Sequence, residues 1–236
     1  MNGAILFDYG GTLDADGVHW LDRFFAIYDR VAPGFRSRDA IKRAFYDAVA
    51  AVEGATDIRS CGLRELVRRH VAEQCRRLDI ADPALEARIA RAFEEPAAWH
   101  LERNRGVLDR LHQDGWQLGV VSNFYGNLAT ICREFSLTPF LDVILDSAVV
   151  GLRKPDARFL ALGLERLGAS AADAFFVGDS LDRDIRPARS LAMRTVWLCD
   201  DLEDPNDGVG LVDVTIRELP EVIGVVAAFA ERGASR

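Results

Sequence analysis

Apolar and polar positions follow two different periods along this chain. Near its start, the short apolar run Ala4-Ile5-Leu6-Phe7 ends abruptly at Asp8, and two glycines follow soon after. A continuous apolar run of this length is typical of a strand that is buried on both faces of a parallel sheet. The pattern therefore predicts a buried first strand that carries a carboxylate at its C-terminal end.

A long stretch with helical periodicity comes next. Apolar residues recur three and four positions apart, as in the stripe Ile41, Ala44, Phe45 and Ala48, and Ser37 is a suitable N-cap for that helix. Four consecutive helices are predicted, near residues 20–31, 37–52, 63–75 and 83–93. Because no strand separates them, we expect residues 16–98 to form a compact helical insert.

Strands and helices alternate after about residue 100. Strands are predicted near 116–122, 140–145, 174–178, 194–199 and 213–216, and helices near 103–113, 125–135, 156–167, 182–191 and 218–230. Strands separated by helices imply right-handed crossovers and a parallel sheet that is covered on both faces. The fold class is therefore α/β, with the first strand joining the sheet from across the helical insert.

Composition and charge narrow the possible functions. The chain has 236 residues, a hydrophobic fraction of 49% and a formal net charge of -8, so it lacks the basic character of a general nucleic-acid-binding protein. No apolar run is long enough to span a bilayer, and the first strand begins too early to leave room for a signal peptide. The four cysteines form no C-x-x-C pair, so we expect reduced thiols in a cytoplasmic protein.

Four short polar stretches follow the predicted strands, where ligands bind in parallel α/β sheets. They are Asp8, Ser122-Asn123, Lys154-Pro155, and Gly178-Asp179-Ser180 with Asp184 further on. Each is weak evidence by itself, since strand ends commonly carry caps and turns. Together they supply a carboxylate nucleophile, further carboxylates for a metal ion, a hydroxyl and an ammonium group. This set suits phosphoryl transfer, in which positioning and charge neutralisation dominate.

The same stretches, in this order and around a helical insert, resemble the motifs of the haloacid dehalogenase superfamily. The first motif corresponds to residues 8–12, the second to Ser122, the third to Lys154, and the fourth to residues 178–184. The resemblance spans nearly the whole chain. It implies a Rossmann-like core domain, residues 1–15 and 99–236, with an inserted α-helical cap domain, residues 16–98, that closes over the site and selects the substrate.

The resemblance also implies roles for the motif residues. Asp8 would be the nucleophile that forms an aspartyl-phosphate, and Ser122 and Lys154 would bind the transferring phosphoryl group, with Asn123 shaping that pocket. Mg²⁺ would be held by Asp8, by Asp179 and by the backbone carbonyl of Gly10. Asp184 would support the metal site through water or through Lys154. The implied function is a phosphatase for a small phosphorylated metabolite.

One position departs from the family pattern. Phosphatases of this family carry a second aspartate two residues after the nucleophile, which protonates the leaving group and later activates water. This chain has Gly10 there, and glycine can do neither. A proton donor could come from elsewhere, and His19, Asp14 and Asp16 are candidates on the loop that enters the insert.

Gly10 leaves three other interpretations open. Phosphonatase-like relatives have a small residue at this position and use a cap lysine, for which Lys42 is the only candidate. A haloacid dehalogenase is disfavoured for two reasons. Those relatives need no metal, whereas the acidic fourth motif is retained here, and they usually carry a tyrosine at the position of Gly10, whereas Tyr9 lies one position earlier. A domain that binds a phosphorylated ligand or a partner without turnover would explain Gly10 but not the retained carboxylates and Lys154.

Overall fold

The computed structural model describes residues 3–199 and 208–234. Its six strands form one parallel sheet in the order β3-β2-β1-β4-β5-β6. The strands are β1 (Ala4–Phe7), β2 (Gln117–Ser122), β3 (Val143–Asp146), β4 (Ala174–Gly178), β5 (Arg194–Leu198) and β6 (Val214–Ile216). The prediction of an α/β fold with a parallel sheet is confirmed. β1 lies at the centre of the sheet, between β2 and β4, although more than 100 residues separate it from either strand.

Nine α-helices lie in the described ranges. They are α1 (Trp20–Val31), α2 (Arg38–Glu53), α3 (Leu63–Arg77), α4 (Pro83–Gln113), α5 (Leu128–Glu134), α6 (Ser147–Val150), α7 (Ala157–Leu167), α8 (Arg186–Ser190) and α9 (Val222–Ala234). Short 3-10 turns add Ile58–Ser60, Thr138–Phe140, Ala171–Asp173 and Leu219–Glu221, and Leu181–Ile185 forms a π-helical turn. None of the described helices combines the length and the apolarity needed to cross a bilayer.

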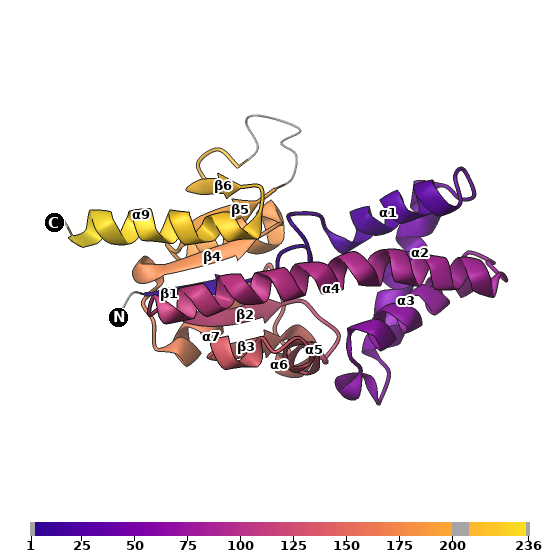
Figure 1. Cartoon of the computed structure of the whole chain (residues 1–236), viewed down its shortest axis with the longest axis horizontal. Coiled ribbons are helices and arrows are strands. Elements are labelled where there is room, and N and C mark those ends of the chain that lie inside the picture. The colour runs from indigo at the N-terminus through magenta and orange to yellow at the C-terminus, as the bar shows by residue number, and fades with distance from the viewer. Residues whose placement is uncertain (1–2, 200–207, 235–236) are drawn as a thin grey trace.

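Alternate residues of β1 face the two sides of the sheet, and both sides are covered. Ile5 and Phe7 pack in a core cluster with residues of α4, α5 and α9, whereas Ala4 and Leu6 pack in a second cluster with α7 and α8. In Figure 1, α4 and α9 cross the near face of the sheet. Burial on both faces explains why the first strand is apolar at every position.

The helical insert lies beyond one end of the sheet. α1, α2 and α3 gather there, and the long helix α4 runs from this group back along the sheet (Figure 1). The prediction of two separate helices near 83–93 and 103–113 was wrong, because α4 is continuous through Pro96. Ala97 and Leu101 are fully buried and continue the apolar stripe between the two predicted segments, so packing keeps the helix intact.

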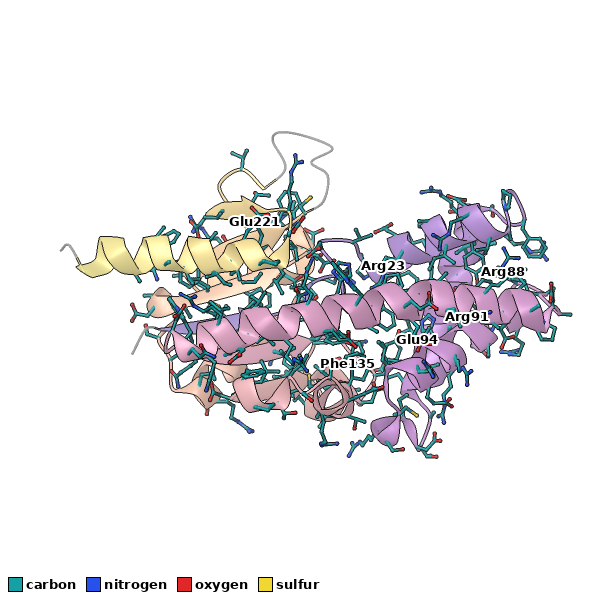
Figure 2. The ribbon with its side chains drawn as sticks, in the orientation of Figure 1. Arg23, Arg88, Arg91, Glu94, Phe135 and Glu221 are labelled. Carbon is teal, nitrogen blue, oxygen red and sulfur yellow. The ribbon has the colours of Figure 1, made fainter. Side chains whose placement is uncertain are left out.

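Because α4 crosses residue 98, the predicted boundary between core and cap falls inside one helix. Arg23 of α1, labelled in Figure 2, helps to fix this junction. It donates a hydrogen bond to the backbone oxygen of Phe93 at 3.1 Å, lies over the Phe93 ring, and forms an ion pair with Asp14. The division into residues 1–15 and 99–236 against 16–98 stays a prediction.

Three of the cysteines, Cys61, Cys75 and Cys132, are buried in the structure, and none of these three forms a disulfide.

Candidate active site

Three neighbouring strands deliver polar side chains to one edge of the sheet. Asp8 follows β1, Ser122 ends β2, and Asp179 follows β4. The register pairs Phe7 with Val120 and with Val177, so these strands end at nearly the same level. Parallel strands that end together place their following residues side by side, and the motifs therefore converge although they are far apart in sequence.

Lys154 is the charge centre of this edge. Its Nζ lies 2.7 Å from Asp8 Oδ1 and 2.6 Å from Asp184 Oδ1, and all three side chains are buried. Burial would raise the pKa of Asp8, but the charge of Lys154 and hydrogen bonds from Lys154 and Ser122 outweigh it and lower that pKa. Burial would likewise lower the pKa of Lys154, and the two carboxylates raise it instead. Asp8 is therefore held as a carboxylate.

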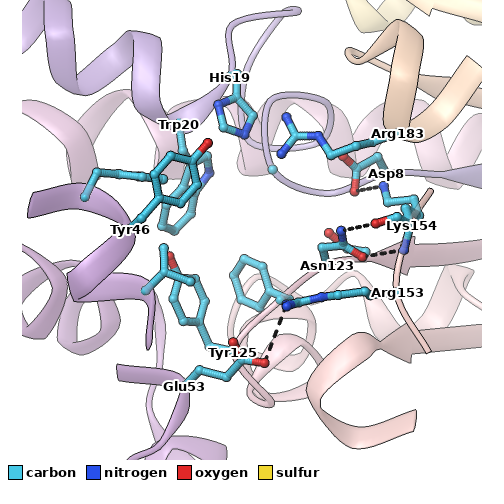
Figure 3. Close-up of a pocket in the computed structure, with 15 residues that line it drawn as sticks. Asp8, His19, Trp20, Tyr46, Glu53, Asn123, Tyr125, Arg153, Lys154 and Arg183 are labelled. Carbon is cyan, nitrogen blue, oxygen red and sulfur yellow. Dashed lines mark hydrogen bonds and ion pairs between the residues drawn. The ribbon is translucent and has the colours of Figure 1, made fainter. Parts of the chain in front are cut away.

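Asn123 fixes the backbone that carries Lys154. The Asn123 Nδ2 donates to the Lys154 backbone oxygen at 2.9 Å, and the Lys154 backbone N–H donates to Asn123 Oδ1 at 2.8 Å. Both ends of the amide are thereby used. Asn123 thus positions Lys154 and lines the cavity beside it (Figure 3).

Three carboxylates form a cluster that could hold a cation. Oxygens of Asp8, Asp179 and Asp184 lie within 4.8 Å of one another. Asp179 Oδ1 is buried and has no hydrogen-bond partner among the described residues, and the pKa of Asp179 is raised well above its usual value by burial and by the charges of Asp184 and Asp8. A hard divalent cation would satisfy this oxygen and neutralise the cluster, so the donor set fits Mg²⁺.

Asp184, the third carboxylate of this cluster, accepts two hydrogen bonds. Both oxygens of Asp184 are engaged, since Oδ1 accepts from Lys154 and Oδ2 accepts from the Ser180 backbone N–H at 3.0 Å. Asp184 thus supports Lys154 directly.

Gly11 has a φ of +92°, and a Cβ there would lie 2.5 Å from Asp179 Oδ2. Only glycine lets the backbone pass this close to Asp179.

Gly10 faces the indole of Trp20. A Cβ on Gly10 would lie 3.2 Å from Trp20 Nε1, and both residues line the same cavity. Trp20 is held in place by Asp14, whose Oδ2 accepts from Trp20 Nε1 at 2.7 Å. Asp14 also accepts from the Gly11 N–H and from Arg23 and is fully buried. Its carboxylate therefore positions Trp20 and does not line the cavity.

The remaining candidates for proton transfer differ in position. Asp16 accepts two hydrogen bonds from Arg103, at 2.8 and 2.6 Å, and does not line the cavity. His19 does line it. His19 is the N-cap of α1, and its Nδ1 accepts the Leu21 backbone N–H at 3.2 Å. Burial and the nearby charge of Arg183 lower the pKa of His19 to about 4, so its ring is neutral at pH 7.

Two further residues from the sequence analysis lie outside the cavity. Tyr9 is fully buried and packs edge-on against Phe124, with ring centroids 4.8 Å apart. Lys42 is exposed on α2, one helical turn before Tyr46, whereas Tyr46 does line the cavity. Neither Tyr9 nor Lys42 is among the described residues that line it. These positions offer no support to a dehalogenase or a phosphonatase.

The cavity has a volume of about 300 Å³ and lies between the sheet edge and the helical insert. Its walls are largely aromatic and apolar, formed by Trp20, Phe45, Tyr46, Val49, Phe124 and Tyr125. Glu53 and Arg153 form an ion pair of 3.6 Å between α2 and the loop before Lys154 (Figure 3). No motif or periodicity marks Glu53 or Arg153 as a cavity residue in the sequence. Arg183 lies inside the fourth motif, residues 178–184, but the motif alone does not distinguish it from the other charged residues of that stretch.

Comparison with known proteins gives a consistent result. A family model described as haloacid dehalogenase-like hydrolase matches residues 3–191. A glyceraldehyde 3-phosphate phosphatase of Methanocaldococcus jannaschii is 38% identical over 97 residues, which cover 39% of this chain and 41% of that protein. A glyceraldehyde 3-phosphate phosphatase of Methanopyrus kandleri is 27% identical over 230 residues, covering 88% and 97%. The match to the first relative thus spans less than half of its length.

Solved structures share the fold. A crystal structure of a dehalogenase superposes with a TM-score of 0.63 at 18% identity, covering 94% of this chain and 96% of that one. A phosphatase structure from Thermococcus onnurineus gives a TM-score of 0.53 at 21% identity, covering 95% and 97%. At these identities the likeness concerns the arrangement of the sheet and the helices.

Proposed function

Because this chain belongs to the haloacid dehalogenase-like hydrolase family, we propose that it is a Mg²⁺-dependent phosphatase that acts on a small phosphorylated metabolite. The observation that carries the proposal is the ion pair between Lys154 and Asp8, which keeps a buried carboxylate ionised beside two further carboxylates. Relatives named as phosphatases support the same reaction class.

In the proposed reaction, an Asp8 oxygen attacks phosphorus and an aspartyl-phosphate forms as the bond to the leaving oxygen breaks. Lys154 and the Ser122 hydroxyl bind the phosphoryl oxygens, and Asp184 and Asn123 keep Lys154 in place. Water then attacks the aspartyl-phosphate, which releases phosphate and restores Asp8.

Mg²⁺ would be held by Asp8, Asp179 and the backbone carbonyl of Gly10, and it would neutralise charge on the transferring group. The raised pKa of Asp179 and the unpartnered Asp179 Oδ1 support this assignment. Asp184 would act through Lys154, since Lys154 already occupies one of its oxygens.

The test is phosphate release from a panel of phosphomonoesters, measured with Mg²⁺ and with EDTA. Repeated turnover that needs Mg²⁺ and is absent in Asp8→Asn would support the proposal. If the protein released phosphate from no member of the panel but still bound phosphate analogues, the result would favour a domain that binds a phosphorylated ligand without turnover.

A further inference from the structure

No carboxyl group among the described residues of the cavity wall is placed to supply the proton that a departing alkoxide needs. Among the described residues that line the cavity, only Asp8 and Glu53 carry carboxyl groups. Asp8 is the proposed nucleophile. Glu53 is paired with Arg153 and lies on the cap side of the cavity, away from Asp8 (Figure 3).

His19 is arranged as a hydrogen-bond donor. Since its Nδ1 accepts the Leu21 N–H, the neutral ring must carry its proton on Nε2. In Figure 3 the ring lies at the cavity beside Arg183. A neutral imidazole can donate a hydrogen bond to a leaving oxygen, but it gives up that proton only at very high pH, so it cannot protonate an alkoxide as it departs.

Arg183 places a positive charge on the same side of the cavity, where it also acts on the carboxylate of Asp179 without a direct ion pair among the described residues. It lines the cavity with Asp8 and His19, and its side chain makes only a long hydrogen bond from Nε to Ser180 Oγ, at 3.4 Å. No carboxylate in residues 3–199 or 208–234 forms an ion pair with it. Neighbouring arginines differ, since Arg186 pairs with Asp182 and Arg189 with Asp213.

We propose that this cavity selects phosphate compounds whose leaving oxygen is acidic enough to depart as an anion, aryl and acyl phosphates, and that Arg183 and the His19 Nε2–H stabilise that anion. This rests on the proposed phosphatase function. An Asp8 oxygen forms the new bond to phosphorus, the old P–O bond breaks, and its electron pair leaves with the oxygen. The protein donates no proton in this step.

The walls of the cavity agree with an aromatic leaving group. Trp20, Phe45 and Tyr125 are among the aromatic side chains that line a space of about 300 Å³, which is at the lower end of the usual range for small-molecule sites. Alkyl phosphates, whose leaving oxygens need a proton, should therefore be poor substrates of this site.

The experiment measures kcat/KM for a series of substituted phenyl phosphates, from 4-nitrophenyl to unsubstituted phenyl, with Mg²⁺. Without proton donation we expect kcat/KM to fall by about 10²-fold or more along the series, the factor that a general acid would otherwise supply. A nearly flat dependence would show that the leaving oxygen is protonated and would overturn the inference, while leaving the phosphatase function intact. No turnover of any member would overturn both.

Arg183→Gln tests the role of the guanidinium. If it stabilises the leaving anion, the variant loses rate on every ester and the dependence on leaving-group acidity becomes steeper. If it only binds the phosphoryl group, all members slow by the same factor and the assignment of Arg183 fails. Arg186→Gln is the matched control, because Arg186 is exposed and outside the cavity. It should leave the series unchanged.

Discussion

The indole of Trp20 occupies the space into which a side chain at position 10 would point. Its Nε1 lies 3.2 Å from the Cβ position of Gly10 and is held by Asp14 at 2.7 Å, and its ring packs edge-on against Phe93 with centroids 4.7 Å apart. The position of the Trp20 indole therefore favours a residue without a side chain at position 10.

This relationship predicts that Gly10→Asp alone does not create a working acid. The new side chain would meet an indole that cannot easily move, so we expect loss of stability of about 1–3 kcal/mol and no gain in turnover of phenyl phosphate. The double variant Gly10→Asp, Trp20→Val removes the obstruction. It should flatten the dependence of kcat/KM on leaving-group acidity and raise turnover of the least acidic ester, by up to about 10²-fold.

Steady-state kinetics and thermal melts of the single and double variants check this prediction. Trp20→Val alone is the control for loss of the aromatic wall. A gain in turnover from Gly10→Asp alone would show that the Trp20 indole moves aside to admit a side chain at position 10. Trp20 would then not be the obstacle to an acid at that position.

Asp8→Asn should abolish turnover while the protein stays folded. We expect kcat/KM to drop by at least about a thousandfold, the scale on which a covalent nucleophile is lost. Lys154 keeps Asp184 as its partner in this variant, so the buried ammonium group remains compensated. Circular dichroism and a thermal melt establish whether the variant is folded. A folded variant with normal activity would show that Asp8 is not the nucleophile.

Mg²⁺ should stabilise the protein against heat, in a way that depends on Asp179. A ligand at 100 times its Kd adds about 2.7 kcal/mol to the free energy of unfolding, and for a chain of this length we expect Tm to rise by about 5 °C or more. Asp179→Asn should remove that rise. Asp182 is exposed and lies in the π-helical turn that follows Asp179, so Asp182→Asn should keep the rise in Tm. Equal shifts in both variants would place the ion elsewhere.

Much of the site was readable from the sequence because parallel strands end at a common edge. Asp8, Ser122 and Asp179 each follow an apolar run, so the topology brings them together without any knowledge of packing. The alternation of strands and helices likewise gave the order of the core elements.

The unpredicted parts depend on how the helical insert packs against the core. Periodicity shows which face of α2 is apolar, but it does not show that Tyr46 and Glu53 line a cavity together with Arg153. The continuity of α4 was missed for a related reason, since burial of Ala97 and Leu101 outweighs the helix-breaking tendency of Pro96. Trp20 over Gly10 is a tertiary contact that spacing cannot reveal.

A last prediction concerns His70, which lies in the core of the helical insert. It is fully buried and stacks on Phe24 at 5.5 Å, and its Nδ1 is bonded to Gln74 Nε2 at 2.8 Å. Burial lowers the pKa of His70 to about 3. In the unfolded chain the histidine binds a proton below about pH 6.5, whereas the folded protein binds it only near pH 3, so stability falls as pH falls through this window.

Between pH 7 and pH 5 this group should remove about 2 kcal/mol from the free energy of unfolding. His70→Gln keeps a polar partner for Gln74 but does not titrate. Between pH 7 and pH 5 its free energy of unfolding should therefore fall by about 2 kcal/mol less than that of the wild type. Urea unfolding at pH 5, 6 and 7 measures the difference, and His112→Gln, at an exposed position, serves as the control. If wild type and His70→Gln lost stability in parallel on acidification, His70 would not be the neutral buried group that the fold requires.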